Sequence, residues 1–424
     1  MEAVPKSGRD SASETQFLDA AEKISRNAML SEIILENMDI RTMHKVRTTT
    51  RVWDEVCQRI TKRRKNVQSV CYAYDFSANP SKGNMRVKPA VQLLHDHGRL
   101  GFKNLMLVNY LIDHFKNNQW SKPRTGFLFH GGIKSVPDLY MLFKKFLPPD
   151  CQILAVTTAN GIVPSVFDTN TKTFSSTEIQ GRGQLIAGVS YLLWPDLGFD
   201  VTFFDENCTL SVFEPKEDDS HKKLKCILIF TNEYMTRVAR RAVYKSFEHV
   251  NNMFASYKKG FALGGVVVDN IFRFPGDECA SDSVRRVRGT KFTGIAISGE
   301  NVKSASGVFD CESLDVLEQE LLEFKQSLDF NPDELSRSVR TMGFLFTCSG
   351  RGPAMFKETN AEIGVINKTF PSVLFTGLYG DGEFGENFWP RNHKQDLSLK
   401  LTEDEETGFW HFYTSVIVLI HVQC

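Results

Sequence analysis

Gly126-Phe127-Leu128-Phe129 recurs letter for letter as Gly343-Phe344-Leu345-Phe346 in the second half of the chain. Each copy leads into a loop that contains glycine, at 130–132 after the first copy and at 348–352 after the second. Short apolar runs that end at glycine are typical of buried strands. A repeat of this kind indicates that one supersecondary unit has been duplicated.

The residues beyond each loop continue the repeat. A helical stretch ends with phenylalanine and proline, at 146–148 in the first copy and at 370–371 in the second. Another apolar run then follows, at 153–156 and at 373–376. Because strands and helices alternate, we predict an α/β (α+β) body in which helices cover mixed sheets.

A looser copy lies between these two. Apolar runs at 227–230 and 261–268 predict two strands, the second of which passes through Gly264-Gly265. The residues between them predict a long amphipathic helix. Its apolar positions are Ala239, Val243, Phe247, Val250, Phe254 and Tyr257.

Composition limits the class of protein. The chain has 424 residues, of which 42% are hydrophobic, so two or three domains with sizeable cores are expected. Lysine plus arginine number 51, as do aspartate plus glutamate, so we expect neither nucleic acid nor a membrane as a partner. The longest apolar run, Val416–Ile420, is too short to span a bilayer.

The nine cysteines include no C-x-x-C pair, and no cysteine–histidine cluster has zinc spacing. We therefore predict no metal and no cofactor. The polar residues 1–27 are predicted to be a disordered tail without the apolar segment of a signal peptide. The expected location is cytoplasmic and nuclear.

Residues 28–65 predict a small helical unit. Leu30, Ile33, Ile34 and Met38 have the spacing of one helix face, and a later helix repeats the pattern from Trp53. A unit of this size rarely stabilises itself by its own core, so its apolar faces need a partner. The alternative is a helical hairpin that packs on the rest of the same chain.

The segment Leu30–Met38, with Met43, Val46 and the late Arg51-Val52-Trp53, resembles an F-box. The resemblance implies a helical unit that binds the Skp-type adaptor, S-phase kinase-associated protein 1, on a cullin scaffold. Nine apolar side chains are predicted to form the adaptor-binding surface: Leu30, Ile33, Ile34, Leu35, Met38, Met43, Val46, Val52 and Trp53.

The remaining body resembles the FIST family, with an N-type half at 66–220 and a C-type half at 221–424. The resemblance rests on four stretches: Gly343–Gly352, Phe370-Pro371, Gly377–Gly385 and His411–His421. The F-box and FIST combination implies a non-catalytic receptor that brings protein substrates to a ubiquitin ligase for ubiquitination and proteasomal degradation. A small-ligand sensor without a ligase role is the alternative, because FIST domains elsewhere are thought to sense small ligands.

Two glycine-rich loops of the C-type half are the predicted substrate or ligand site. In the first loop, Gly350 and Gly352 allow backbone N–H groups to converge on an anion, and Arg351 could bind a carboxylate through two hydrogen bonds. The neighbouring Cys348 is expected to have a lowered pKa, which also raises the alternative of an enzyme with a cysteine nucleophile. A tight turn with a buried thiol is the structural alternative.

In the second loop, Asp381 and Glu383 lie among four glycines. Paired carboxylates can transfer protons or hold a cation. The alternative is a glycine-rich hairpin with solvated acids. We predict that recognition takes place between the two loops.

Overall fold

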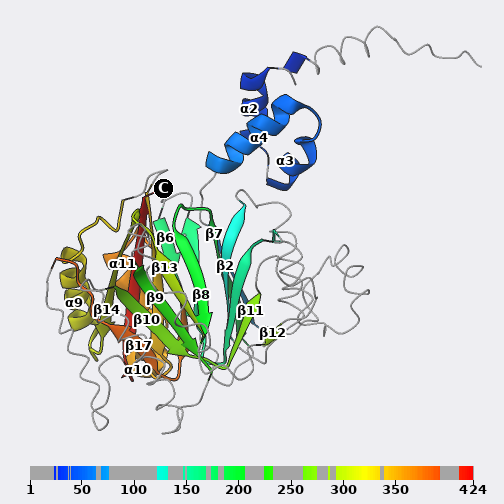
Figure 1. Ribbon diagram of the computed structural model, residues 1–424. Helices are drawn as coiled ribbons and strands as arrows, with labels where there is room; N and C mark the ends of the chain where they lie inside the picture. Colours follow the sequence, from blue (N-terminus) through cyan, green and yellow to red (C-terminus); the bar gives the residue numbers. More distant parts are fainter. Residues whose placement is uncertain are drawn as a thin grey trace, which may run out of the picture. The chain divides into compact units, whose positions relative to one another are not determined.

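The computed structural model describes sixteen ranges of the chain: 23–24, 27–36, 38, 40–63, 68–75, 122–131, 147–148, 150–168, 173–179, 186–205, 224–232, 261–274, 285–286, 293–334, 339–391 and 410–423 (Figure 1). The chain divides into two compact units, residues 1–66 with 110–122 and residues 67–109 with 123–424. No helix in these ranges has the length and apolar composition needed to cross a membrane. Apart from residues 23, 24 and 27, the tail predicted at 1–27 lies outside the described residues, as does the helix predicted between 239 and 257.

The described residues of the smaller unit form three helices: α2 (Ala28–Glu36), α3 (Ile40–Val46) and α4 (Arg51–Arg63). The Asn27 side chain accepts hydrogen bonds from the first backbone N–H groups of α2, and the Thr50 hydroxyl accepts one from Trp53 in α4. These bonds satisfy donors that a helix start leaves without partners. The core of the unit consists of Leu35, Met43, Val56, Cys57 and Ile60.

In the larger unit, the strands that the structure describes form three mixed sheets and one small hairpin. The first sheet has β1 (Gln68–Asp75), β7 (Ile186–Pro195), β2 (Pro123–Gly131), β3 (Gln152–Thr158), β11 (Asn270–Phe274) and β12 (Arg285–Arg286), in that order. The second has β18 (Trp410–His411), β17 (Glu383–Glu386), β10 (Ala262–Val267), β9 (Leu224–Thr231), β13 (Thr293–Ser298) and β8 (Asp200–Asp205). The third has β14 (Val302–Phe309), β19 (Ser415–Gln423), β15 (Val339–Cys348), β16 (Leu374–Gly380) and β4 (Ile162–Val163), and the hairpin pairs β5 (Ser165–Asp168) with β6 (Thr173–Ser176).

The three sheets follow one plan. Each is centred on a parallel pair, β2 with β3, β9 with β10, and β15 with β16. An antiparallel strand, β7, β13 or β19, lies beside the first member of each pair. The next strand outward, β1, β8 or β14, is also antiparallel. The described strands therefore form three structural repeats, and the middle copy expected from the sequence is one of them.

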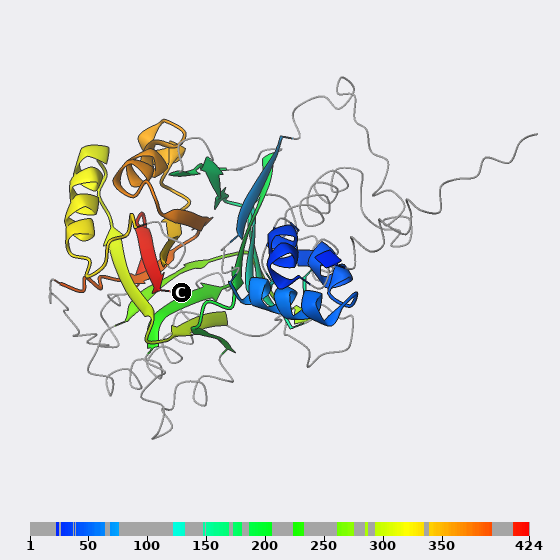
Figure 2. The ribbon, with the colours of Figure 1, turned by 90° about the horizontal axis from the view of Figure 1, so that it is seen from above.

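Strand exchange links the repeats into a closed cycle. The strand that follows each parallel pair along the chain joins a different sheet. After the first pair, β4 pairs with β16 of the third sheet; after the second pair, β11 pairs with β3 of the first sheet; and after the third pair, β17 pairs with β10 of the second sheet. Figure 2 shows strands of the three sheets on three sides of one interior. The predicted boundary at 220/221 falls between β8 and β9, which belong to the same sheet.

The two copies of the repeated tetrapeptide meet in this interior. Side chains alternate between the faces of a strand, so Phe127 and Phe129 face one way and Leu128 the other. The Phe127 ring lies 5.4 Å from that of Phe344, and the Phe230 ring of the middle repeat lies 5.7 Å from that of Phe346. Aromatic contacts between sheets thus hold the repeats together.

Helices cover the outer face of the third sheet (Figure 1). They are α9 (Leu314–Gln326) and α11 (Ala361–Thr369), with the short α10 (Pro353–Phe356) before α11. The buried apolar side chains of α9 and α11 pack against Leu345, Phe375 and Leu419 in a second core. Helices over mixed sheets confirm the predicted α/β (α+β) class. In the second tetrapeptide copy, Phe370-Pro371 does follow the helix; the equivalent helix of the first copy lies outside the described residues.

Candidate functional site

One face of α2 is apolar and exposed. Met29, Leu30, Ile33 and Ile34 are 74%, 44%, 52% and 36% exposed. The inward face of the same helix consists of Ser31 and Leu35, which are fully buried one turn apart. Contiguous exposed apolar side chains of this kind mark an interaction surface.

The predicted adaptor-binding residues fall into three groups. Leu30, Ile33 and Ile34 are exposed, and a second set is half-buried: Met38, Val46, Val52 and Trp53. The remaining two, Leu35 and Met43, are buried in the core of the unit. Direct contact between these two side chains and a partner is therefore not supported, because they already pack α2 and α3 against α4.

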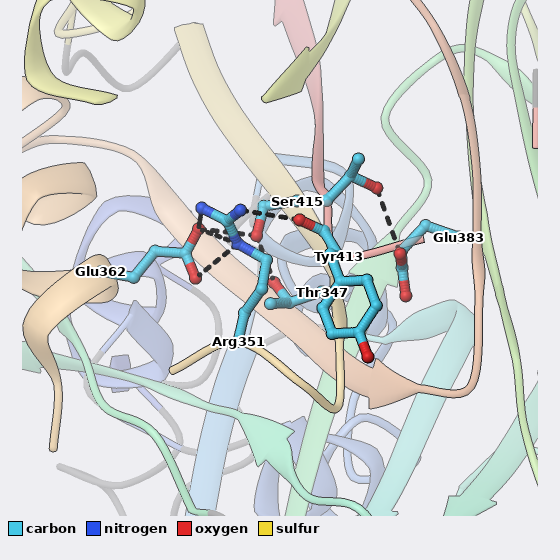
Figure 3. Close-up of polar contacts among 7 residues, drawn as sticks. Thr347, Arg351, Glu362, Glu383, Tyr413 and Ser415 are labelled. Carbon is cyan, nitrogen blue, oxygen red and sulfur yellow. Dashed lines mark hydrogen bonds and ion pairs between the residues drawn. The ribbon is translucent and has the colours of Figure 1, made fainter. Parts of the chain in front are cut away.

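The first glycine loop is built around a buried ion pair. Arg351 and Glu362 are 0% and 1% exposed, and Arg351 Nη2 lies 2.9 Å from Glu362 Oε1. Arg351 Nε donates to both carboxylate oxygens, at 3.0 and 3.3 Å, and Nη1 donates to the Tyr413 carbonyl at 2.8 Å. Figure 3 shows this arrangement, with Ser415 donating to Glu362 at 2.7 Å.

This geometry corrects the role predicted for Arg351. The guanidinium is fully buried, is paired with Glu362 and donates to the Tyr413 carbonyl, so it has no exposed surface with which to bind a ligand carboxylate. Although burial acts to lower the pKa of Arg351, the adjacent Glu362 carboxylate outweighs it and raises that pKa. Arg351 is therefore a charged structural residue that connects the loop after β15 to α11 and to the Tyr413 carbonyl.

The chemistry predicted for Cys348 is also corrected. Burial raises the pKa of its thiol, and the nearby Glu383 carboxyl raises it further. The pKa is not lowered as predicted, because burial and Glu383 outweigh the lowering effect of backbone hydrogen bonds such as that from the Gly350 N–H. A raised pKa leaves less thiolate at neutral pH, so this site lacks the activation that a cysteine nucleophile needs.

The two acids of the second loop do not act as a pair. Asp381 is exposed and accepts hydrogen bonds from Asn160 Nδ2 at 3.0 Å and Ser349 Oγ at 3.3 Å. Glu383 is fully buried, with Thr414 Oγ1 donating to one oxygen at 3.1 Å and no partner at the other. Burial raises the pKa of Glu383 well above its ordinary value of 4.5.

The structure does bring the two predicted loops together. Ser349 N–H donates to the Gly380 carbonyl at 2.8 Å, and Cys348 N–H donates to the Thr414 carbonyl at 3.0 Å. Gly350 and Gly352 lie in the turn between β15 and α10, where Gly352 has a φ of 59°. Among the described side chains, no three histidines, cysteines or acids converge as a metal site.

Three residues that complete the loops were not predicted from the sequence: Glu362, Tyr413 and Thr414. Glu362 carried a usable signal, because it lies on the same face of α11 as Ile363 and Ile366. A charged residue on an apolar helix face is expected to have a buried partner.

No family model matches the chain. Two relatives do match. The first is F-box only protein 22 of Homo sapiens, 21% identical over 421 residues that cover 94% of each chain. The chain is similar to F-box only protein 22 along almost its whole length. The second, F-box only protein 22 of Pongo abelii, is 24% identical over 300 residues, 66% of each chain. Both relatives are F-box proteins by name, which agrees with the F-box resemblance of the helical unit.

Proposed function

We propose that the chain is the substrate-recognition subunit of a Skp–cullin–F-box ubiquitin ligase. In this role α2 docks the Skp-type adaptor, and the three-sheet body holds a protein substrate for ubiquitination and proteasomal degradation. The exposed apolar face of α2 carries the proposal, and the similarity to F-box only protein 22 supports it. The chain itself is non-catalytic and acts by raising the effective concentration of the substrate near the charged enzyme. We propose that it does so in the cytoplasm and nucleus.

The energetics are consistent with docking through α2. Burial of one large apolar side chain contributes roughly 1.5–3 kcal/mol, whereas association costs about 4–15 kcal/mol. Met29, Leu30, Ile33 and Ile34 together offset much of that cost. The half-buried Val52 and Trp53 would extend the same interface, and an aromatic anchor is typical of its most important contacts.

The double variant Leu30→Glu/Ile34→Glu tests the proposal. Two carboxylates on this face would have to be desolvated in the interface, so we expect co-purification with the Skp-type adaptor and cullin to fall at least about tenfold. Both side chains are exposed, so the melting temperature should change little. Truncating Trp53 would be a less clean test, because this side chain also packs against the core of the unit.

Leu322→Glu is the matched control. Leu322 lies on α9 and is 43% exposed, against 44% for Leu30. The control should bind adaptor and cullin as the parent chain does. Undiminished co-purification by the double variant, or an equal loss in the control, would refute docking through α2.

A further inference from the structure

An aromatic turn joins β18 to β19. Phe412 and Tyr413 are 47% and 63% exposed, and the Trp410 ring stacks on that of Phe412 with centroids 5.9 Å apart. Tyr413 has a φ of 59°, in the left-handed region that bulky residues rarely adopt. Large aromatic side chains at a protein surface are typical of binding sites, because they offer contact area at low entropic cost.

The two glycine loops pack directly under these rings. A Cβ atom at Gly350 would lie 2.7 Å from the Tyr413 ring, and one at Gly382 would lie 3.5 Å from the Phe412 ring. Arg351 holds the backbone of the turn through the Tyr413 carbonyl. The turn is therefore part of a preorganised surface, which lowers the entropic cost of binding.

Two carboxylates lie at the second glycine loop: Asp381 is part of it, and Asp269 is close enough to Asp381 for the two charges to repel each other. Asp381 precedes Gly382, and its Oδ1 accepts from Ser349, the neighbour of Gly350. Asp269 lies on the turn after β10, where it accepts from the Ala159 N–H, and Asn160 next to Ala159 donates to Asp381. Turns from all three sheets thus meet at this place.

The negative charge here is not neutralised within the described part of the chain. Neither Asp269 nor Asp381 is ion-paired with a lysine or arginine there. Burial raises the pKa of Asp269, and repulsion from Asp381 adds to the rise. A cation placed between the two would relieve this repulsion.

We propose that Phe412, Tyr413, Asp269 and Asp381 form the substrate-docking surface, and that it takes a peptide segment carrying lysine or arginine. The inference rests on the proposed function and adds the chemistry of the substrate. A guanidinium or ammonium group binds the face of an aromatic ring and pairs with adjacent carboxylates. The whole chain has a formal net charge of zero, so attraction of a cationic segment comes from this local site.

Selection from a phage-displayed library of random dodecapeptides, with the full chain as bait, tests the proposal. We expect enriched peptides to be rich in lysine and arginine and to bind more weakly as salt rises. In fluorescence polarisation, the strongest peptide should bind Tyr413→Asn and Asp269→Asn/Asp381→Asn at least about tenfold more weakly. Asparagine is chosen at 413 because it tolerates the left-handed backbone, and at 269 and 381 because it keeps a hydrogen-bond acceptor.

Asp315→Asn on the exposed face of α9 is the control and should bind like the parent chain. Absence of enrichment, enrichment of acidic or purely apolar peptides, or equal binding by the charge variant would overturn the proposal. If Tyr413→Asn does not fold, the charge variant alone decides. Adaptor and cullin co-purification is measured on the same preparations. Absence of peptide binding by the parent chain with intact co-purification refutes only the docking surface, whereas peptide binding by the parent chain without co-purification refutes only the ligase role.

Discussion

Replacing Arg351 with methionine is expected to lower the free energy of unfolding by about 3–5 kcal/mol, the usual effect of breaking a buried ion pair by removing one partner. Glu362 would remain buried with its charge uncompensated, and among the described groups Ser415 alone would donate to it. The Tyr413 carbonyl would also lose its donor. Urea denaturation of the parent chain and the variant measures the difference.

The double variant Arg351→Met/Glu362→Met separates charge from packing. Apolar residues of similar volume often replace a buried ion pair at little cost, so the double variant should be more stable than Arg351→Met alone. Lys368→Met is the matched control at the exposed pair Lys368–Glu318, whose atoms lie 2.6 Å apart. Its effect should stay within about 1 kcal/mol. The ion-pair explanation would be contradicted if the losses of unfolding free energy in Arg351→Met and in Glu362→Met simply added in the double variant.

The sequence predicted much of the local structure of the body but little of its connectivity. The repeated Gly-Phe-Leu-Phe correctly marked the first strands of two parallel pairs, because a short apolar run bounded by glycine depends on nearby residues alone. Pairing of β4 with β16 joins Val163 to Gly377 and depends on the closed arrangement of all three sheets. No spacing within either segment encodes that contact, so the exchange of strands was not predicted.

Burial explains the errors at the candidate sites. The F-box resemblance placed Leu35 and Leu30 on the same predicted adaptor-binding surface, yet Leu35 lies inward and Leu30 outward. Spacing identifies apolar positions, but it does not say whether a partner or the unit's own helices cover them. Likewise, an arginine in a glycine loop predicts a ligand-binding cation, but the packing of α11 on the third sheet brings Glu362 to Arg351, and the loop sequence does not encode that contact.

Glu383→Gln is expected to stabilise the body at neutral pH and to leave it unchanged in acid. Burial raises the pKa of Glu383 well above 4.5, so the unfolded chain ionises this group at a lower pH than the folded chain. The contribution to stability is therefore complete below about pH 4.5 and is lost as the pH rises toward the folded-state pKa. Between the two pKa values the parent chain loses up to about 1.4 kcal/mol per pH unit through this group.

Glutamine removes this loss because it is neutral at every pH and its carbonyl oxygen still accepts from Thr414. Urea denaturation from pH 4 to pH 8 should show a difference between variant and parent that grows with pH. Glu323→Gln, at an exposed position on α9, is the control and should show no such trend. If the difference in unfolding free energy between Glu383→Gln and the parent chain did not change with pH, the shape of the side chain at position 383 would matter and its charge would not.

Cys348 gives an independent readout of the same group. The Glu383 carboxyl is, after burial, the largest contribution to the raised pKa of this thiol. Alkylation of Cys348 by iodoacetamide should therefore begin at a lower pH in Glu383→Gln than in the parent chain, since only the thiolate reacts. Because burial remains, the pKa of Cys348 should still exceed that of an exposed cysteine. An alkylation profile identical to that of the parent chain would show that Glu383 carries no charge over the range in which the thiol titrates.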